Sequence, residues 1–473
     1  MADHHVKHKF QPSDLALWSG GAWHGDLPDD IQGFSIDTRT LQPGDMFVAL
    51  RGETSDGHRH LAAAARAGAT ALLIDEASAA DGITTPCLIV DDTRKALTSL
   101  SRGYRRVLHF RHLAAVTGSV GKTTVKELLA DMLAPAGLTA RSKGNWNNDL
   151  GVPLSLLATS PDAVFGVYEI GMNHPGELDP LCDLLEPDLA IVTCVGPVHI
   201  ENFENEVGIA REKAAVYRGL RGGGTAILNA DDRHAPVLRE YLVGSRVVEV
   251  SVRSPADYVF RRTDAATGSF ELHERESDQR VTMTASLPGD YFIVNAALAA
   301  AAARAAGASW DHIIDAVKNY RPLSMRWTRS CMHGVDIIND AYNANPVSMR
   351  AAMQAFLEEP CAGRRWVVLG GMLELGAREK DYHHEVGATV NSLPEVQLLA
   401  VGERGAWIAD GAISAGMNVD KVLAVPDHQS AARCLADAVQ PGDAILLKAS
   451  RSEAMEKVLA GWAAMVDERE KFD

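Results

Sequence analysis

The chain has 473 residues, of which 46% are hydrophobic and 23% charged, a composition typical of a globular protein with room for about three domains. Its formal net charge of −16, from 46 basic and 62 acidic residues, argues against a nucleic-acid partner, which requires a basic face. The 6 cysteines are scattered without a CxxC pair, so we expect neither a disulfide framework nor a zinc site.

The N-terminus, MADHHVKHKF, lacks the apolar core of a signal peptide, and no uninterrupted apolar stretch is long enough to span a bilayer. We therefore expect a cytoplasmic monomer with no membrane insertion. His4, His5 and His8 are interpreted as part of a frayed terminus rather than as metal ligands.

The first of three zones covers residues 1–108 and has the texture of a small α/β module. The short apolar runs MFVAL, ATALLI and CLIV, separated by polar turns, predict strands. The stretch SLSRGYRRVLHFRH predicts a helix that leads into the next zone.

The second zone, residues 109–322, alternates strands with helices. A short apolar strand is followed by a glycine-bearing loop and then by a helix with one apolar stripe, formed by Val125, Leu128, Leu129, Met132 and Leu133. This alternation predicts a parallel sheet covered on both faces. The expected strands are Leu113–Val116, Phe165–Ile170, Leu189–Val195 and Ala226–Leu228, and a helix at Asn295–Ala306 is expected to be capped by Gly307.

The third zone, residues 323–473, alternates again and predicts a Rossmann-like open sheet. No GxGxxG follows its first strand, so a dinucleotide is not indicated. The expected strands are Trp366–Leu369, Leu398–Val401, Val422–Val425 and Ala444–Leu447.

The strongest local signal is TGSVGKTT, between a predicted strand and a predicted helix, which is typical of a phosphate-binding loop. Its glycines allow backbone N–H groups to face a phosphate, Lys122 supplies a cation for the β- and γ-phosphates, and Thr123 supplies a hydroxyl for Mg²⁺. Val116 stands where the strict pattern has glycine. The loop alone leaves GTPases, transport ATPases, kinases and ligases open. We expect it to bind a nucleotide through Thr117, Gly118, Ser119, Val120, Gly121, Lys122, Thr123 and Thr124.

Polar segments follow the other predicted strands of the second zone. Glu169 ends one strand, His199 lies in the loop after another, and Lys213 lies in the helix-like segment IAREKAAVY. Because the carboxyl ends of parallel strands line the ligand crevice, we expect Glu169 and His199 to face the phosphates. Taken singly, Glu169 is better explained as a solvated surface charge and His199 as a hydrogen-bonded structural residue than as metal ligands.

The segments TGSVGKTT, GNWNNDLGVPLSLL, EIGMNHPGEL, VGPVHIENF and LNADD, in this order, resemble the central domain of the Mur ligases. In the third zone DAYNANPVSM and LKASRSEAME, and in the first zone SIDTRTLQPGDMFVAL and SDGHRH, are also similar to this family. The resemblance therefore covers nearly the whole chain in blocks. EIGMNHPGE is the most telling, because it is similar to the branch of the family that adds D-alanyl-D-alanine.

The resemblance implies an ATP- and Mg²⁺-dependent ligase that joins D-alanyl-D-alanine to UDP-N-acetylmuramoyl-tripeptide, the final cytoplasmic step of peptidoglycan precursor synthesis. ATP would phosphorylate the free carboxylate of the tripeptide, and the amine of the dipeptide would then displace phosphate. It also implies an α/β fold of three domains: a small uridine-nucleotide-binding domain at 1–108, a central P-loop domain with a parallel sheet at 109–322, and a C-terminal Rossmann-like domain at 323–473 that takes the dipeptide.

The resemblance also implies roles for individual residues. The catalytic residues would be Lys122, His199 and Lys213, the last of them carbamylated by CO₂. Two Mg²⁺ ions would be served by Thr123, Glu169 and His199. Asn295, Arg326 and Asp340 would contact the nucleotide. The substrates would be bound by Thr38, Arg39, Asp56, Gly57, His58, Asn145, Asn147, Asn148, Tyr342, Asn343, Asn345, Ser450 and Arg451.

The chain departs from the family pattern at several positions. Tyr291 and Phe292 replace histidine and asparagine before the alanine-rich helix, Asn339 and Ala341 flank Asp340 in a changed motif, and Gly371 and Ala449 replace aspartate and glycine.

Rival interpretations are a folylpolyglutamate synthase, the diaminopimelate- or lysine-adding sister ligase, and a P-loop regulatory module or transport ATPase. The first-zone segments argue against the first rival, and the absence of a DNPR-like motif from the sequence argues against the second.

Overall fold

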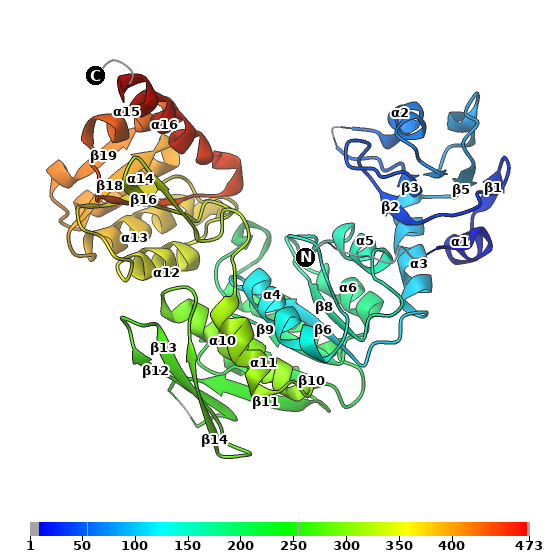
Figure 1. Cartoon of the computed structure of the whole chain (residues 1–473), viewed down its shortest axis with the longest axis horizontal. Coiled ribbons are helices and arrows are strands. Elements are labelled where there is room, and N and C mark those ends of the chain that lie inside the picture. Colours follow the sequence, from blue (N-terminus) through cyan, green and yellow to red (C-terminus); the bar gives the residue numbers. More distant parts are fainter. Residues whose placement is uncertain (1–8, 54, 254, 471–473) are drawn as a thin grey trace.

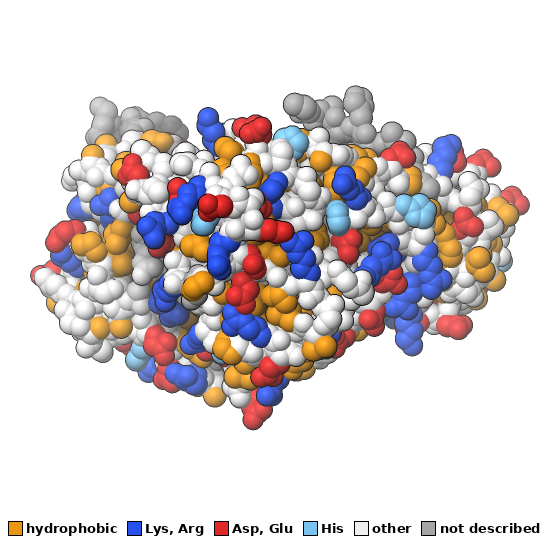
Figure 2. Space-filling view, turned by 90° about the horizontal axis from the view of Figure 1, so that it is seen from below, with side chains coloured by type: hydrophobic (Ala, Val, Ile, Leu, Met, Phe, Trp, Pro, Cys, Tyr) orange, Lys and Arg blue, Asp and Glu red, His pale blue; other side chains and the backbone are white. Residues whose placement is uncertain are grey.

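The computed structural model describes residues 9–53, 55–253 and 255–470, so His4, His5 and His8 lie outside the described residues. The described strands form three sheets, one in each zone of the sequence. Figure 1 shows the first sheet on the right, the central sheet below and the third sheet on the left. Charged side chains of both signs are interspersed on the face shown in Figure 2. Among the described residues, no helix is both long and apolar enough to cross a bilayer.

The first domain is a five-stranded sheet with three helices. Its strands are β1 (Ala22–His24), β2 (Gly33–Ser35), β3 (Asp45–Val48), β4 (Ala71–Ile74) and β5 (Cys87–Ile89), and its helices are α1 (Pro12–Ser19), α2 (Leu61–Arg66) and α3 (Thr93–Arg105). The strand order is β1-β5-β4-β3-β2, and only β1 runs antiparallel to its neighbour. The strands expected at MFVAL, ATALLI and CLIV are confirmed.

The helix predicted at residues 99–112 is present, but both of its predicted ends are wrong. It begins earlier, at Thr93, because the Asp92 side chain accepts a hydrogen bond from the Lys95 backbone N–H and caps the first turn. It ends at Arg105, and His112 already belongs to the first strand of the central sheet. The apolar residues Val107 and Leu108 therefore lie in a connection rather than in the helix.

Helix α3 packs the first domain onto the central domain. The Tyr104 hydroxyl donates to the Thr159 carbonyl at 2.7 Å, and the Arg105 Nε donates to the Leu185 carbonyl at 2.8 Å. Buried apolar side chains of both domains form one continuous core. Gly103 lets α1 approach, because a Cβ there would overlap the indole ring of Trp18.

The central domain carries the largest sheet. Its strands are β6 (His112–Thr117), β7 (Thr139–Arg141), β8 (Phe165–Glu169), β9 (Leu189–Val192), β10 (Thr225–Asn229), β11 (Arg246–Ser251), β12 (Tyr258–Asp264), β13 (Ser269–Glu274) and β14 (Gln279–Thr284). Its helices are α4 (Lys122–Leu133), α5 (Gly151–Leu157), α6 (Leu178–Leu185), α7 (Glu206–Lys213), α8 (Ala215–Arg218), α9 (Ala235–Arg239), α10 (Asp290–Ala305) and α11 (Trp310–Asn319).

The strand order is β14-β13-β12-β11-β10-β9-β6-β8-β7, parallel from β7 to β12 and antiparallel beyond. The four expected strands are confirmed, but β9 ends at Val192 because the next residues turn toward the phosphate loop. Helix α10 begins at Asp290, before the expected Asn295, and Gly307, with φ of 88°, follows its C-cap as expected.

The third domain is a six-stranded sheet flanked by helices. Its strands are β15 (Thr328–Met332), β16 (Val335–Asn339), β17 (Arg365–Leu369), β18 (Val396–Val401), β19 (Val422–Val425) and β20 (Ala444–Lys448), and its helices are α12 (Pro346–Phe356), α13 (Glu379–Asn391), α14 (Gly402–Ser414), α15 (His428–Ala438) and α16 (Glu456–Glu470). The order is β15-β16-β20-β17-β18-β19, with only the β15–β16 hairpin antiparallel. The four strands expected here are confirmed.

Among the described residues, several contacts join the third domain to the central domain. Val347 packs against Gly196, Glu358 pairs with Arg262, and Glu374 pairs with His199. Two of these contacts involve the loops that follow β9, so the third domain lies over the carboxyl edge of the central sheet.

Replacing Gly103 by Ala tests the packing of α1 on α3. Helix propensity alone favours Ala over Gly by about 1 kcal/mol, so an open site would be stabilised. The overlap with Trp18 reverses the sign, and we expect the free energy of unfolding of the first domain to fall by about 1–3 kcal/mol.

The measurement is chemical denaturation followed by tryptophan fluorescence. Gly208→Ala in α7 is the matched control, because a Cβ there meets no atom closer than 3.7 Å. A Gly103→Ala variant as stable as Gly208→Ala would contradict the packing described.

Candidate active site

The phosphate loop is fixed against the chain that follows β9. Thr193 Oγ1 donates to the Val120 carbonyl at 2.5 Å, and the Ser119 N–H donates to the Cys194 carbonyl at 2.8 Å. Gly118 has φ of 146°, and a Cβ there would overlap Thr193 Oγ1. Only glycine satisfies both the backbone conformation and the close approach, so the loop shape depends on this residue.

Lys122 starts α4 and folds back over the loop. Its Nζ donates to the Gly118 carbonyl at 2.8 Å. Burial lowers the pKa of Lys122 below its ordinary value, Glu169 opposes this shift and Arg326 adds to it. An ammonium group held among backbone dipoles, beside a second cation, favours binding of a polyanion such as a triphosphate.

Glu169 is the buried acid of the site, with 1% of its surface exposed. It ends β8 and pairs in register with Val116, the residue that precedes the loop. Its Oε2 accepts from Thr123 Oγ1 at 2.7 Å, and its Oε1 accepts from Asn147 Nδ2 at 2.8 Å. Both donors are neutral, so the ionised carboxylate would be balanced by the nearby charge of Lys122 and by a bound cation.

Among the described residues, no group of three or more His, Cys, Asp and Glu side chains is arranged to hold a metal ion. Thr123 and Glu169 nevertheless present a hydroxyl and a carboxylate side by side. Mg²⁺ is commonly held by one or two such oxygen ligands, with phosphate oxygens and waters completing its octahedron. The donor set therefore fits Mg²⁺ bound together with a nucleotide.

His199 and Lys213 lie in the segment after β9. His199 adopts φ of 55°, and its Nδ1 pairs with the Glu374 carboxylate of the third domain. Lys213 ends α7, is 2% exposed, and makes no hydrogen bond or ion pair with any residue that the structure describes. Burial first, and Lys122 second, lower the pKa of Lys213 to about 7. A large fraction of this amine is therefore neutral near pH 7.

Lys126 is a positioning residue that sequence reasoning missed. It is fully buried, and its Nζ donates to the carbonyls of Ser142 and Gly144, both at 2.8 Å. The Ser142 hydroxyl in turn accepts from the Glu169 backbone N–H at 2.8 Å. Lys126 thus fixes the segment that carries Asn147. The available signal was its place one helical turn after Lys122, between Val125 and Leu128 of the apolar stripe.

The residues expected to contact the nucleotide have different surroundings. Asn295 lies against the loop, because a Cβ on Gly121 would overlap its side chain. The Arg326 guanidinium stacks on the Tyr342 ring at 3.9 Å from its centroid. The Asp340 carboxylate is already engaged, accepting from Lys448 Nζ at 2.7 Å and from the Trp327 backbone N–H at 3.1 Å.

Several residues expected to bind substrate also make local structural bonds. Asn345 Oδ1 accepts from the Ser348 N–H at 2.9 Å as the N-cap of α12, and Asn343 Oδ1 accepts from the Ala344 N–H at 2.8 Å. Ser450 is buried and accepts from the Leu373 N–H at 3.2 Å, whereas Arg451 pairs with Glu456 at 2.8 Å. In the central domain, Asn148 Oδ1 accepts from the Gly151 N–H at 2.8 Å at the start of α5, and Asn145 is exposed.

The first-domain residues form two turns. Arg39 Nη2 pairs with Asp37 Oδ2 at 2.6 Å, which lowers the pKa of Asp37 to about 2, and Thr38 lies between them. Asp56 accepts from the His58 backbone N–H at 3.0 Å, with Gly57 packed against the backbone of Ala49 and Leu50, the two residues after β3. Within the described residues, no hydrogen bond or ion pair links these turns to the phosphate loop.

The fold and the site define a class. This is a three-domain α/β enzyme whose central domain binds a nucleoside triphosphate on a phosphate loop, beside a buried glutamate. Comparisons with known proteins narrow the class further. Residues 30–105 match the model of the Mur ligase family catalytic domain, residues 116–303 the Mur ligase middle domain, and residues 325–451 the Mur ligase glutamate ligase domain.

Relatives match over nearly the full length. The chain is 35% identical to the UDP-N-acetylmuramoyl-tripeptide–D-alanyl-D-alanine ligase of Escherichia coli, over 92% of this chain and 95% of that protein. A crystal structure of MurF from Acinetobacter baumannii superposes with a TM-score of 0.87 at 29% identity, covering 97% of this chain and 99% of that one. MurF ligase of Thermotoga maritima in complex with ADP superposes with a TM-score of 0.78 at 27% identity, covering 92% and 98%. The chain belongs to the Mur ligase family.

Gly118→Ala tests the loop geometry. We expect affinity for a fluorescent ATP analogue to fall by about 100-fold or more, because the added Cβ overlaps Thr193 Oγ1 and strains a φ of 146°. Gly144→Ala is the control. Its φ of 55° is also positive, but a Cβ there meets nothing within 4 Å. Equal affinities in the two variants would contradict the loop described here.

Proposed function

We propose that this chain is an ATP-dependent amide ligase that joins D-alanyl-D-alanine to UDP-N-acetylmuramoyl-tripeptide, the last cytoplasmic step of peptidoglycan precursor synthesis. The observation that carries the proposal is the 35% identity, over 92% of the chain, to a relative of that name. The buried Thr123–Glu169 contact beside the phosphate loop supports it, because the hydroxyl and the carboxylate that could bind Mg²⁺ with a nucleotide are both present.

The reaction has two steps. The tripeptide carboxylate attacks the γ-phosphorus of ATP, and the bond from this phosphorus to the β–γ bridging oxygen breaks. ADP departs, and the tripeptide now carries an acyl phosphate. The amine of D-alanyl-D-alanine then attacks the acyl carbon, loses a proton, and displaces inorganic phosphate. Little covalent help is needed from the protein, so its residues act by positioning and by neutralising charge. Lys122 neutralises phosphate charge, and the first domain holds the uridine diphosphate away from the reacting carboxylate.

Mg²⁺ would neutralise the charge between ATP and the tripeptide carboxylate, two anions that otherwise repel each other. We infer that Thr123 and Glu169 hold one ion, with Asn147 and Lys126 keeping the carboxylate oriented. His199 serves the second ion. Its pairing with Glu374 of the third domain gives it a fixed orientation from the non-coordinating side of the ring.

Lys213 is proposed to carry a carbamate. The neutral amine attacks the carbon of CO₂ and loses a proton, which gives a carbamate anion. A side chain that is a cation when protonated therefore becomes an anion. The burial of Lys213, its lack of a partner within the described residues and the nearby charge of Lys122 all favour this conversion. The anion would face the cationic side of the site and support the second Mg²⁺.

The remaining residues are assigned by domain. Asn295, Arg326 and Asp340 are proposed to border the nucleotide, and the first and third domains to hold the two substrates, in a cytoplasmic monomer with domains at 1–108, 109–322 and 323–473. We propose that the substrates are contacted by Thr38, Arg39, Asp56, Gly57, His58, Asn145, Asn147, Asn148, Tyr342, Asn343, Asn345, Ser450 and Arg451.

The test of the proposed function is phosphate release from ATP, measured with each substrate alone and with both, together with mass detection of the pentapeptide product. Inorganic phosphate should accumulate only when both substrates are present. ATP hydrolysis that is indifferent to both, without product, would return the chain to P-loop ATPases of another function.

The carbamate predicts a dependence on CO₂. With a pKa of about 7, the neutral fraction of Lys213 rises from about one tenth at pH 6 to about nine tenths at pH 8. At fixed CO₂ pressure, loading should therefore rise with pH across this window. ¹³C NMR with ¹³CO₂ should detect one protein carbamate, and Lys213→Met should remove it and lower kcat by about 100-fold or more.

Lys318→Met, at an exposed site of α11, is the control for loss of one lysine. Unchanged activity in CO₂-free buffer, with no carbamate signal in the wild-type protein, would refute the modification.

Lys126→Met tests positioning through the segment 142–147. The variant keeps the apolar stem of the side chain but loses both bonds to the segment. We expect the Mg²⁺ concentration for half-maximal rate to rise by about 10-fold or more, with the KM for D-alanyl-D-alanine unchanged. Lys318→Met serves again as control. A lower melting temperature with an unchanged Mg²⁺ requirement would show that Lys126 only stabilises the fold.

A further inference from the structure

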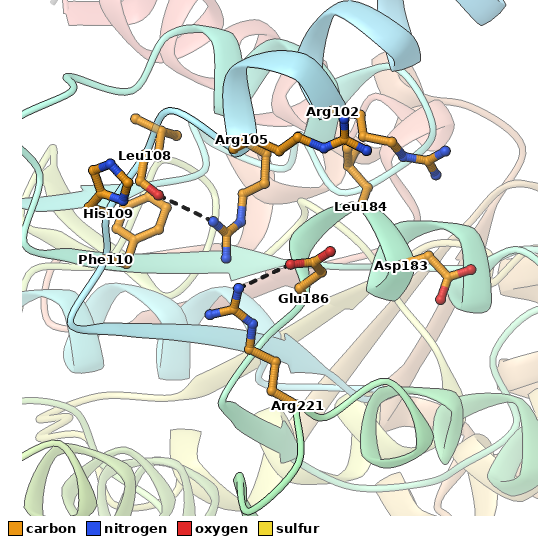
Figure 3. A pocket seen from close by; sticks show the side chains of 10 residues that line it. Arg102, Arg105, Leu108, His109, Phe110, Asp183, Leu184, Glu186 and Arg221 are labelled. Atoms are coloured by element: carbon orange, nitrogen blue, oxygen red, sulfur yellow. Dashed lines mark hydrogen bonds and ion pairs between the residues drawn. The ribbon is translucent and has the colours of Figure 1, made fainter.

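A hollow of about 350 Å³ lies at the junction of the first and central domains. Its residues come from the end of α3, the end of α6 and the loop after α8 (Figure 3). These segments precede or flank the starts of β6, β9 and β10. The phosphate loop and Glu169 follow strand ends, so the hollow lies at the opposite edge of the same parallel sheet.

Cations outnumber anions in this hollow. Four arginines line it, Arg102, Arg105, Arg106 and Arg221, against the carboxylates of Asp183 and Glu186. Arg221 pairs with Glu186 at 3.1 Å, whereas Arg102 and Arg106 make no ion pair within the described residues. The excess of positive charge runs against a chain with a net charge of −16.

Arg105 is built into the wall of the hollow. Only 6% of it is exposed, its Nε donates to the Leu185 carbonyl at 2.8 Å, and its Nη1 donates to the Leu108 carbonyl at 3.4 Å. Its guanidinium lies 5.4 Å from the Phe110 ring centroid, and no carboxylate pairs with it within the described residues. Burying a guanidinium without a paired anion costs free energy. The two hydrogen bonds of Arg105 within the described residues use its Nε and Nη1, so its Nη2 is available to a ligand.

Arg105 and Arg221 form a pair of like charges. Figure 3 shows their guanidinium groups pointing toward one another, with Glu186 beside them. Burial, and then the charge of Arg221, lower the pKa of Arg105. Two guanidinium groups that face each other with one shared carboxylate leave positive charge that an added anion would neutralise.

We propose that this hollow binds a phosphate-type oxyanion between Arg105 and Arg221, with Arg102 and Arg106 at its rim. Planar guanidinium forks match the oxygens of a phosphate group in pairs, which makes arginine the suitable residue for this ligand. The volume admits the free ion or a small phosphate monoester. A ligand here would bridge α3 of the first domain to the end of α6, and so stiffen the junction that places the first domain over the central one.

The test uses the full chain with the phosphate loop saturated by a non-hydrolysable ATP analogue and Mg²⁺, so that the loop does not compete. Inorganic phosphate and glycerol phosphate are titrated separately by calorimetry. We expect one binding event per chain that weakens as salt rises. Binding of both probes identifies a site for the free ion, and binding of glycerol phosphate alone identifies a site for a phosphorylated metabolite.

Two variants locate the event. Arg102→Ser/Arg106→Ser removes two exposed side chains, and Arg221→Ser removes the central partner of Arg105; each should weaken binding by about 10-fold or more. Arg433→Ser, at an exposed site of α15, should leave it unchanged. No binding to the wild-type protein at millimolar probe, or an equal loss in Arg433→Ser, would overturn the proposal. Ligase activity is not the readout, so the outcome is independent of the proposed function.

Discussion

The hydrogen bond from Thr123 to Glu169 is the contact on which the site depends. It joins the first turn of α4 to the last residue of β8, and so ties the phosphate loop to the neighbouring strand. The parallel register makes this possible, because Glu169 pairs with Val116 immediately before the loop. A shift of that register by one residue would turn the carboxylate to the other face of the sheet.

The rest of the surroundings hold this buried carboxylate in place. Asn147 bonds its second oxygen, Ser142 accepts from its backbone, and Lys126 fixes the segment on which both residues lie. The buried ammonium of Lys126 is satisfied by backbone carbonyls and by Glu127 at 2.9 Å, so its charge is balanced locally. The site is therefore oriented before any ligand binds, which reduces the reorganisation required during phosphoryl transfer.

Charge balance explains why Lys122 is proposed to stay a cation and Lys213 to become an anion. Burial lowers the pKa of both Lys122 and Lys213, and the charge of Lys122 lowers the pKa of Lys213 further. Bound phosphates would stabilise the charged form of Lys122, whereas the amine of Lys213 has no anionic partner within the described residues. Conversion of Lys213 to a carbamate would remove the repulsion and add an anion. One set of buried residues thus favours binding of polyanion, metal and CO₂ together.

Much of the fold was predictable from the sequence, because apolar runs of the right length mark buried strands wherever both faces of a sheet are covered. The strands at Leu398–Val401 and Trp366–Leu369 are examples. The antiparallel arm β12–β14 was missed, since its strands alternate polar and apolar residues and lack long apolar runs. That alternation is the pattern of strands with one exposed face, and it was available in the text of residues 258–284.

In the candidate site too, some residues were predictable from the sequence and others were not. The phosphate loop and Glu169, which lie together in the structure, were predicted from local motifs and from the resemblance they carry, whereas the role of Lys213 stays a prediction. Lys126 was missed because its function depends on carbonyls from a loop sixteen and eighteen positions further along the chain, which no local pattern reveals. The arginine hollow was missed for the same reason, since α3 and the loop after α8 meet only in the folded chain.

The most direct test of the central claim is anomalous diffraction from crystals grown with Mn²⁺, a non-hydrolysable ATP analogue and the tripeptide substrate. We predict a manganese peak bonded to Thr123 Oγ1 and Glu169, with the hydrogen bond between them replaced by two metal bonds. A second peak is expected near His199 and Lys213. A nucleotide bound on the loop with manganese elsewhere, and with the Thr123–Glu169 hydrogen bond intact, would contradict it.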